Sequence, residues 1–368
     1  MNTQLRVPSR DAALDATRTV AIWLMITCHV SRLISKRARP EWMKFGMLIE
    51  PLCQALFMSM VGVSLVYSLR IATSRGQDGW TKRQIRRAGE LWLIGFVLFF
   101  CQRGWQWPWT VAAHGILEAI AEAMLLFLPA VLLGRERPAR GALVAGAITV
   151  AMMATDWILD AQGIRILVLN AGNGCVIPYA IPTGFGVVAA YALLDGGEKA
   201  KAGLLLFASV CAAFTLSQVG FEDAFGKPFG RVSTPADFRV ASDGFTQVWK
   251  LLTDQHLREY EASYYNFRPG LIPLLFALCT AIYTGFRLLG RVTERLQPLW
   301  VVGRHSLGVY VLHLILVAIP VIVTGENRAL PEPAQANAGF VVILACCYAY
   351  AAWKDWRTAR RRAAAIPG

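Results

Sequence analysis

Two side chains that could do chemistry lie eleven residues apart in the first apolar segment, Arg18 and His29. At 100° per residue of α-helix, eleven residues turn through about 1100°, which is about 20° more than three full turns. The two residues therefore share one face of the predicted helix, about 16 Å apart along its axis. A guanidinium binds anionic groups and an imidazole exchanges protons near neutral pH, so the pair is typical of acid–base chemistry on an anionic ligand. The structural alternative is that Arg18 reaches the lipid headgroups and His29 hydrogen-bonds between helices.

A second row of polar residues has helical spacing: His114, Glu118 and Glu122, at i, i+4 and i+8. Two carboxyl groups on one face of an apolar helix are costly at bilayer depth, and such groups usually pair with cations or carry protons. Glu118 is expected at about the same depth in the membrane as His29, and Glu122 deeper on the same helix face. We therefore expect Glu118 to be the carboxylate that fixes the tautomer of the His29 imidazole. A purely structural salt bridge is the alternative for both glutamates.

A third row is Ser306, Tyr310 and His313, with Arg304 and His305 just before it. Its i, i+4, i+7 spacing again puts the three side chains on one helix face. This row is the less specific of the three, because Ser and Tyr commonly hydrogen-bond between membrane helices.

The composition excludes a water-soluble globule. The 368 residues are 55% hydrophobic and only 17% charged, with a mean hydropathy of +0.44, whereas a soluble domain carries about 25% charged residues. Disordered, collagen-like and disulfide-scaffold classes are excluded as well. The eight cysteines form no CxxC pair and no Cys/His spacing, so no metal is expected. The net charge of +13 lies largely in short loops, where it sets topology, and nucleic acid is not expected as a partner.

The apolar runs predict an all-α, polytopic membrane helix bundle, one domain over residues 1–368 with about ten spans of about 20 residues each. The expected spans are 16–34, 49–69, 88–107, 111–133, 141–159, 176–194, 202–219, 270–289, 305–324 and 339–356. Basic residues of the short loops gather on one side, which predicts that both termini are cytoplasmic. The first span follows charged residues and ends in a basic segment, so we expect it to be retained. On the other side, residues 221–268 form a long loop in which an interfacial helix is expected.

Several segments match, in chain order, the motifs of one class of membrane enzyme. Residues 14–18, LDATR, followed by His29, resemble an LDxxR…H first helix; residues 57–64 resemble FxxxxGxS; and residues 303–313 resemble GRxSLxxYxxH. Residues 115–121 are similar to the fourth-helix segment of the same class of enzyme. On these motifs the chain resembles the integral-membrane acyltransferases, that is, the acyltransferase-3 family and the heparan-α-glucosaminide N-acetyltransferase-like proteins. In this chain Thr19 stands where many relatives have Gly, and Gln54 where some have Pro.

The resemblance implies transfer of an acyl group, expected to be acetyl, from acyl-CoA to a hydroxyl or amine of a glycan, lipid or small-molecule acceptor. His29 is then the base or acyl carrier, and Glu118 and Glu122 are its expected carboxylate partners. The residues expected to bind the donor are Arg18, Arg83, Arg86, Arg87, Arg304 and His313. Three of them fall in a basic segment, 70–87, expected to be a loop; a topology determinant touching anionic lipid is the alternative for that segment.

The same resemblance implies a multi-pass protein of the inner cell membrane whose partners are lipid, donor and acceptor, with a homodimer left open. Acyl-CoA is expected as a co-substrate, and no cofactor is expected to stay bound. The rival interpretation is a proton-coupled transporter of a small anion or lipid-linked substrate, because intramembrane His and Glu also suit proton coupling. A transporter moves its substrate without covalent change, whereas the enzyme leaves an acyl group on an acceptor.

Overall fold

The computed structural model describes residues 11–34, 39–43, 50–103, 115–162, 169, 175–221, 272–324, 330 and 332–364, and these are helical or form turns, without a strand. The helices are α1 (Ala12–Arg32), α3 (Glu50–Ser74), α4 (Trp80–Arg103), α6 (Ile116–Leu133), α7 (Pro138–Ala161), α8 (Val176–Ala190), η2 (Tyr191–Asp195), α9 (Glu198–Phe221), α12 (Ile272–Leu288), α13 (Gly290–Arg295), η6 (Gln297–Trp300), α14 (Val301–Arg304), α15 (Ser306–Thr324) and α16 (Pro333–Ala364). The predicted all-α fold is thus confirmed for the described residues, and a helix lies at each of the ten predicted segments.

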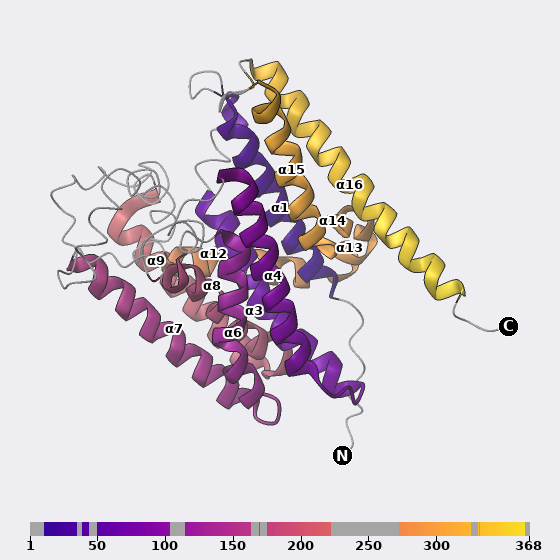
Figure 1. The fold of residues 1–368 in the computed structure, drawn as a ribbon. Helices are drawn as coiled ribbons and strands as arrows, with labels where there is room; N and C mark the ends of the chain where they lie inside the picture. The colour runs from indigo at the N-terminus through magenta and orange to yellow at the C-terminus, as the bar shows by residue number, and fades with distance from the viewer. Residues whose placement is uncertain are drawn as a thin grey trace, which may run out of the picture. The chain divides into compact units, whose positions relative to one another are not determined.

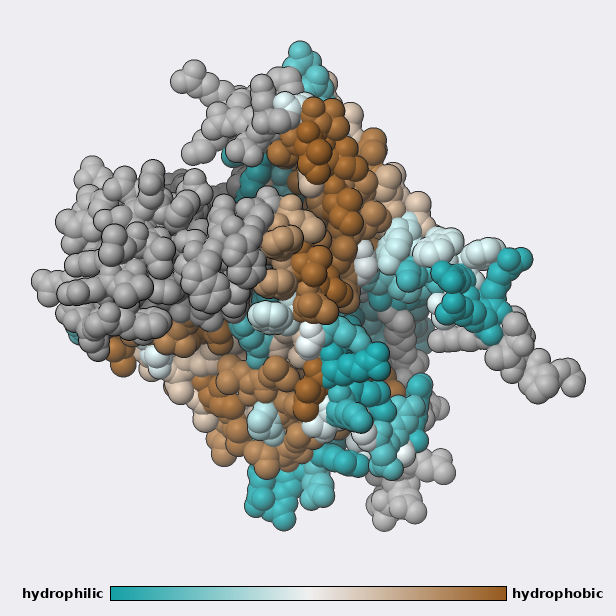
Figure 2. Space-filling model, viewed as in Figure 1, coloured by the Kyte–Doolittle hydropathy of each residue, from teal (hydrophilic) through white to brown (hydrophobic). Residues whose placement is uncertain are grey.

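Six stretches of described helix are long and apolar enough to cross a bilayer, judged by length and composition: α3, α6, α7, α8 continued by η2, α15 and α16. The other four predicted segments, in α1, α4, α9 and α12, do not reach that threshold. In α1 the charged side chains of Asp15 and Arg18 interrupt the apolar sequence. The apolar surface of α15 and α16 is exposed in the isolated chain, as Ile322 at 77% and Val323 at 78% illustrate, and Figure 2 shows brown side chains there. Such a surface suits contact with lipid.

The chain divides into two compact units. Unit 1 contains the described residues within Met58–Thr280, and unit 2 contains those within Ser9–Phe57 and Ala281–Gly368. In unit 2, the N-terminal helix α1 packs with α13, η6, α14, α15 and α16 from the far end of the chain, and α1, α15 and α16 run side by side (Figure 1).

Helix α1 begins at a sharply defined cap. The Asp11 side chain accepts hydrogen bonds from the backbone N–H of Ala13 at 2.9 Å and of Leu14 at 3.2 Å, which satisfies two donors that the first turn leaves open. The Tyr283 hydroxyl of α12 donates to the other oxygen of Asp11 at 2.8 Å. Start and orientation of α1 are therefore set by residues of unit 2 itself.

The register of α1 against the C-terminal helices follows from two contacts. Thr19 meets Gly303, and His29 meets His313, and both pairs are 284 residues apart in sequence. Because the offset is the same over ten residues, α1 runs parallel to the α14–α15 segment in one fixed register. Ten residues of helix span about 15 Å, so the second contact lies about 15 Å further along the axis than the first.

Unit 1 is built around α6, which packs against α4, α7 and α8. Helices α3 and α8 approach so closely that a Cβ on Gly62 would overlap the carbonyl oxygen of Thr183. The Thr183 hydroxyl also donates to the Met58 carbonyl at 3.1 Å. Near the C-terminal end of α3, Arg70 forms an ion pair with Asp195 of η2, with 2.7 Å between the nitrogen and the oxygen.

Two sequence expectations about this region were wrong in detail. Residues 70–87 are not a loop, because α3 continues to Ser74 and α4 begins at Trp80. The turn between them uses Gly76 at φ +60° and Gly79 at φ +73°, a backbone region that glycine adopts without strain. The fourth predicted span starts later than expected, at Ile116, with Gly115 in extended conformation as its N-cap. The expected interfacial helix in 221–268 lies outside the described residues.

Candidate functional site

Two imidazole rings meet inside unit 2, His29 of α1 and His313 of α15. Nδ1 of His29 lies 2.9 Å from Nε2 of His313, which is a hydrogen-bond distance. The ring planes differ by 9°, and the ring centroids are 5.1 Å apart. Rings stacked face to face do not bring two nitrogens so close, so these two bond edge to edge and nearly in one plane. We call the pair the histidine dyad.

The two members of the histidine dyad differ in exposure. His313 is 0% exposed, its Nδ1 lies 3.4 Å from the carbonyl oxygen of Val309, and the Tyr310 ring packs edge-on against it at 5.2 Å. Tyr310 in turn contacts Phe57 of α3, with 6.1 Å between ring centroids. His29 keeps partial exposure. His29 is therefore the more exposed member of the dyad, and His313 is the buried one.

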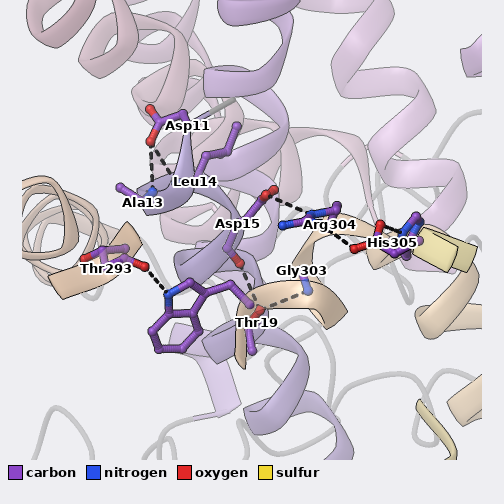
Figure 3. A network of polar contacts seen from close by, with 11 residues as sticks. Asp11, Ala13, Leu14, Asp15, Thr19, Thr293, Gly303, Arg304 and His305 are labelled. Carbon is purple, nitrogen blue, oxygen red and sulfur yellow. Dashed lines mark hydrogen bonds and ion pairs between the residues drawn. The ribbon is translucent and has the colours of Figure 1, made fainter. Parts of the chain in front are cut away.

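A second cluster of polar side chains lies near the start of α1 (Figure 3). Arg304 of α14 forms an ion pair with Asp355 of α16, and its Nε lies 3.8 Å from Oδ2 of Asp15. Nε2 of His305 lies 2.8 Å from Oδ1 of Asp355. We call Asp15, Arg304, His305 and Asp355 the Arg304 cluster. Because the Asp15 side chain is only 3% exposed, its charge needs a nearby cation, and the cluster joins α1, α14 and α16.

The Arg304 cluster bears on the expected donor site. The Arg304 guanidinium contacts carboxylates from two helices, and a planar guanidinium suits such carboxylate pairing. These contacts favour a role for Arg304 in joining helices over one in binding donor phosphates.

One turn further along α1, Thr19 closes the contact with α14. Its hydroxyl donates to the Asp15 carbonyl at 2.9 Å and accepts from the Gly303 backbone N–H at 2.9 Å (Figure 3). A Cβ on Gly303 would overlap the Asp15 carbonyl oxygen, so the backbones touch here. The threonine that replaces the glycine of many relatives thus has a defined partner in this chain.

The two glutamates predicted beside His29 lie on α6, in unit 1. Glu118 is two residues after the start of the helix, about 3 Å along the axis, and not about 10 Å below its end as the longer predicted span implied. The Glu118 carboxylate accepts from the Gly115 N–H at 3.1 Å, and a Cβ on Gly95 of α4 would overlap it. A carboxylate in the first turn is also stabilised by the helix dipole. The pairing of Glu118 with His29 stays a prediction, as does the role of Glu122, which is partly buried.

The arginines predicted to bind the donor lie on two helices. Arg18 is partly buried on α1, on the face it shares with His29. Arg83, Arg86 and Arg87 occupy positions i, i+3 and i+4 of α4, so they share one face, and all three are exposed. The ion pair of Arg86 with Glu90, at 2.8 Å, is too exposed to hold the arginine firmly.

Sequence reasoning missed Asp355, Thr19 and Gly303 as residues of the site region. Thr19 directly follows one recognised motif and Gly303 opens another, and a contact between those motifs would have revealed both residues. Asp355 stands among basic residues near the end of the last predicted span, where an acidic residue at bilayer depth is itself a signal of a cationic partner. Among the described residues, no group of three or more His, Cys, Asp or Glu side chains could hold a metal ion.

Comparison with known sequences adds one finding. The model of a family described as heparan-alpha-glucosaminide N-acetyltransferase, catalytic, matches residues 10–218, more than half of the chain. The matched region contains His29, Arg18, the three α4 arginines and both glutamates of α6, whereas His313 and Arg304 lie beyond it. No curated protein matches the chain.

Proposed function

Because the chain belongs to the heparan-alpha-glucosaminide N-acetyltransferase catalytic family, we propose that it is a multi-pass membrane acyltransferase that uses acyl-CoA, in particular acetyl-CoA, as donor. The acceptor is a hydroxyl or amine of a glycan, a lipid or a small molecule. The observation that carries the proposal is the histidine dyad. One member of the dyad, His29, is a partly exposed residue inside the matched region. Its Nδ1 lies at hydrogen-bond distance from the buried His313, and a general base needs a ring held in this way.

The proposed reaction needs one proton transfer in each direction. His29 takes the proton from the acceptor hydroxyl or amine while that oxygen or nitrogen attacks the thioester carbonyl carbon. The new C–O or C–N bond forms, the C–S bond breaks, and the thiolate of the donor leaves with the electron pair. The imidazolium then gives its proton to the thiolate, so His29 returns to its starting state and no other reactant is consumed.

The phosphates of the donor need cationic partners. Arg83, Arg86 and Arg87 form an exposed face on the first two turns of α4, and Arg18 lies on the same helix face as His29. A guanidinium binds phosphate through two parallel N–H groups, so these four arginines are our candidates for donor binding. Arg304 is not among them because two carboxylates already engage it.

The proposal includes a topology. Ten spans with both termini in the cytoplasm put the α4 arginines on the cytoplasmic side, where acyl-CoA is made, and put His29 past the midplane. The location proposed is the inner cell membrane. Acceptors on the far side would then meet a donor that enters from the cytoplasm, with membrane lipid as the surrounding partner.

The test is acyl transfer by the purified protein in lipid nanodiscs. Acetyl-CoA labelled in the acetyl group is supplied with membrane and metabolite extracts, and labelled acceptors are identified by mass spectrometry in lipid, glycan and small-molecule fractions. We expect label on an acceptor, and a loss of at least about 100-fold with His29→Ala, because general-base catalysis contributes about 10²–10⁴-fold.

The matched control is His305→Gln, which changes another histidine of unit 2 and keeps a donor toward Asp355. We expect it to retain most of the activity. Label that crosses the membrane of proteoliposomes without covalent change would show a transporter instead, and a fully active His29→Ala variant would remove His29 as the base.

A further inference from the structure

The two ring nitrogens of His313 face different hydrogen-bonding partners, an imidazole and a carbonyl oxygen. Its Nε2 faces Nδ1 of His29 at 2.9 Å, and its Nδ1 faces the Val309 carbonyl oxygen at 3.4 Å. A neutral imidazole has one N–H donor and one bare nitrogen that accepts. A carbonyl oxygen can only accept, so Nδ1 of His313 carries the hydrogen and its Nε2 is bare.

The tautomer of His29 follows from the tautomer of His313. A bare Nε2 on His313 accepts, so Nδ1 of His29 must donate to it, and the remaining lone pair of His29 lies on Nε2. We infer that His313 is a positioning residue that holds His29 in the Nδ1–H form, so that Nε2 of His29 is the atom that takes the proton of the acceptor. This inference rests on the proposed function for its catalytic meaning and on the contacts alone for the tautomer.

The packing around His313 supports this role. The ring is fully buried, and Tyr310 lies edge-on against it at 5.2 Å, so the ring has little freedom to turn over. The near-coplanar dyad, with 9° between the planes, points the bare nitrogen of His313 at the N–H of His29 in the plane of both rings. His313 comes from the motif at 303–313, and its role here differs from the donor binding expected from the resemblance.

The same hydrogen bond serves the charged state of His29. When Nε2 of His29 takes the proton, both of its nitrogens are N–H donors, and Nδ1 still donates to His313. The bond then has a cationic donor, and hydrogen bonds to charged groups are roughly twice as strong as neutral ones. His313 therefore stabilises the imidazolium without receiving a proton itself. The predicted pairing of His29 with Glu118 is a separate contact and stays a prediction.

Two substitutions distinguish the role of His313 Nε2, which accepts from His29, from that of its Nδ1, which donates to Val309. The amide of His313→Gln reaches the position of Nε2 and can accept from His29, whereas the amide of His313→Asn reaches only the position of Nδ1 toward Val309. We expect His313→Gln to keep turnover within about threefold of wild type. We expect His313→Asn to lose between about 10-fold and 10⁴-fold, the range from a weakened base to a wrong tautomer.

A spectroscopic readout tests the tautomer without relying on activity. Nitrogen-15 spectra of histidine-labelled protein in nanodiscs distinguish protonated from bare ring nitrogens, and a His29→Gln spectrum assigns the His29 signals. We expect His29 to show protonated Nδ1 and bare Nε2 in wild type and His313→Gln, and a mixture in His313→Asn. Protonated Nε2 on His29 in wild type, or equal activity of the two His313 variants, overturns the inference. Absence of acyl transfer by wild type would instead refute the proposed function, while the spectra still decide the tautomer.

Discussion

Replacing Thr19 by valine should weaken the packing of α1 on α14, because the Thr19 hydroxyl accepts the hydrogen bond that joins the two helices. Valine keeps the shape of threonine but cannot accept from the Gly303 N–H, which donates to the Thr19 hydroxyl at 2.9 Å. Thr19 is 0% exposed, so water cannot replace the lost partner without opening the contact. A buried donor left without a partner costs about 1–3 kcal/mol. That range corresponds to a factor of about 5–160 in the folding equilibrium.

The assay is reversible unfolding in mixed micelles, followed by tryptophan fluorescence, with hydrogen exchange at the Gly303 amide as a local readout. The matched control is Thr17→Val, because Thr17 is also 0% exposed on α1, but its hydroxyl only donates to the Ala13 carbonyl of the same helix at 2.8 Å. We expect Thr19→Val to lower the free energy of unfolding by about 1–3 kcal/mol more than the control and to speed exchange at Gly303. Equal losses in the two variants would refute the reasoning, since the interhelical bond would then contribute nothing.

Two further substitutions test other contacts. Gly95→Ala places a Cβ against the Glu118 carboxylate, which is buried and held by the Gly115 N–H. Its free energy of unfolding should therefore be about 1–3 kcal/mol lower than that of Gly89→Ala, on the same helix with open space around it, and equal effects would contradict the described packing of α4 on α6. Asp355→Asn weakens the Arg304 cluster and should cost about 1–2 kcal/mol, less than a fully buried ion pair because the Asp355 side chain is 31% exposed. Glu90→Gln, which removes an exposed ion pair, should cost under about 0.5 kcal/mol in the same denaturation assay, and a similar cost for both would argue against the cluster.

Periodicity predicted the helices and the faces of their polar residues, because the period of 3.6 residues is local information. The shared face of Arg18 and His29 follows from it, and α15 begins at Ser306, within one residue of the expected start. The contact of His29 with His313 did not follow, because it depends on the register between helices 284 residues apart. Periodicity alone does not say which helices touch, and the pairing of His29 with Glu118 stays a prediction.

Polar residues were harder to interpret where two different structural roles are compatible with the same sequence pattern. The basic residues after Arg70 looked like a loop that sets topology, yet Arg83 and Arg87 are on the helix α4 and the connecting turn is short. Arg304 was expected to bind phosphate. The sequence alone does not tell whether the anionic partner of an arginine is a ligand or an aspartate of the same chain. Asp355 supplies that anion from α16, another contact that only the packed helices reveal.

The parallel register of α1 with α14 and α15 has a consequence for how the protein is made. A ribosome adding about 5–20 residues per second needs roughly 14–57 s to synthesise the 284 residues that separate Thr19 from Gly303. During that interval α1 has left the ribosome with Asp15, Thr19 and His29 but without the partners that these residues have in the finished unit 2. We therefore expect the nascent chain to need the insertion machinery, or a chaperone in the membrane, to protect a charged helix until its partners are made. Slowing synthesis of the segment between the two halves of unit 2 should increase degradation of the chain before the contact forms.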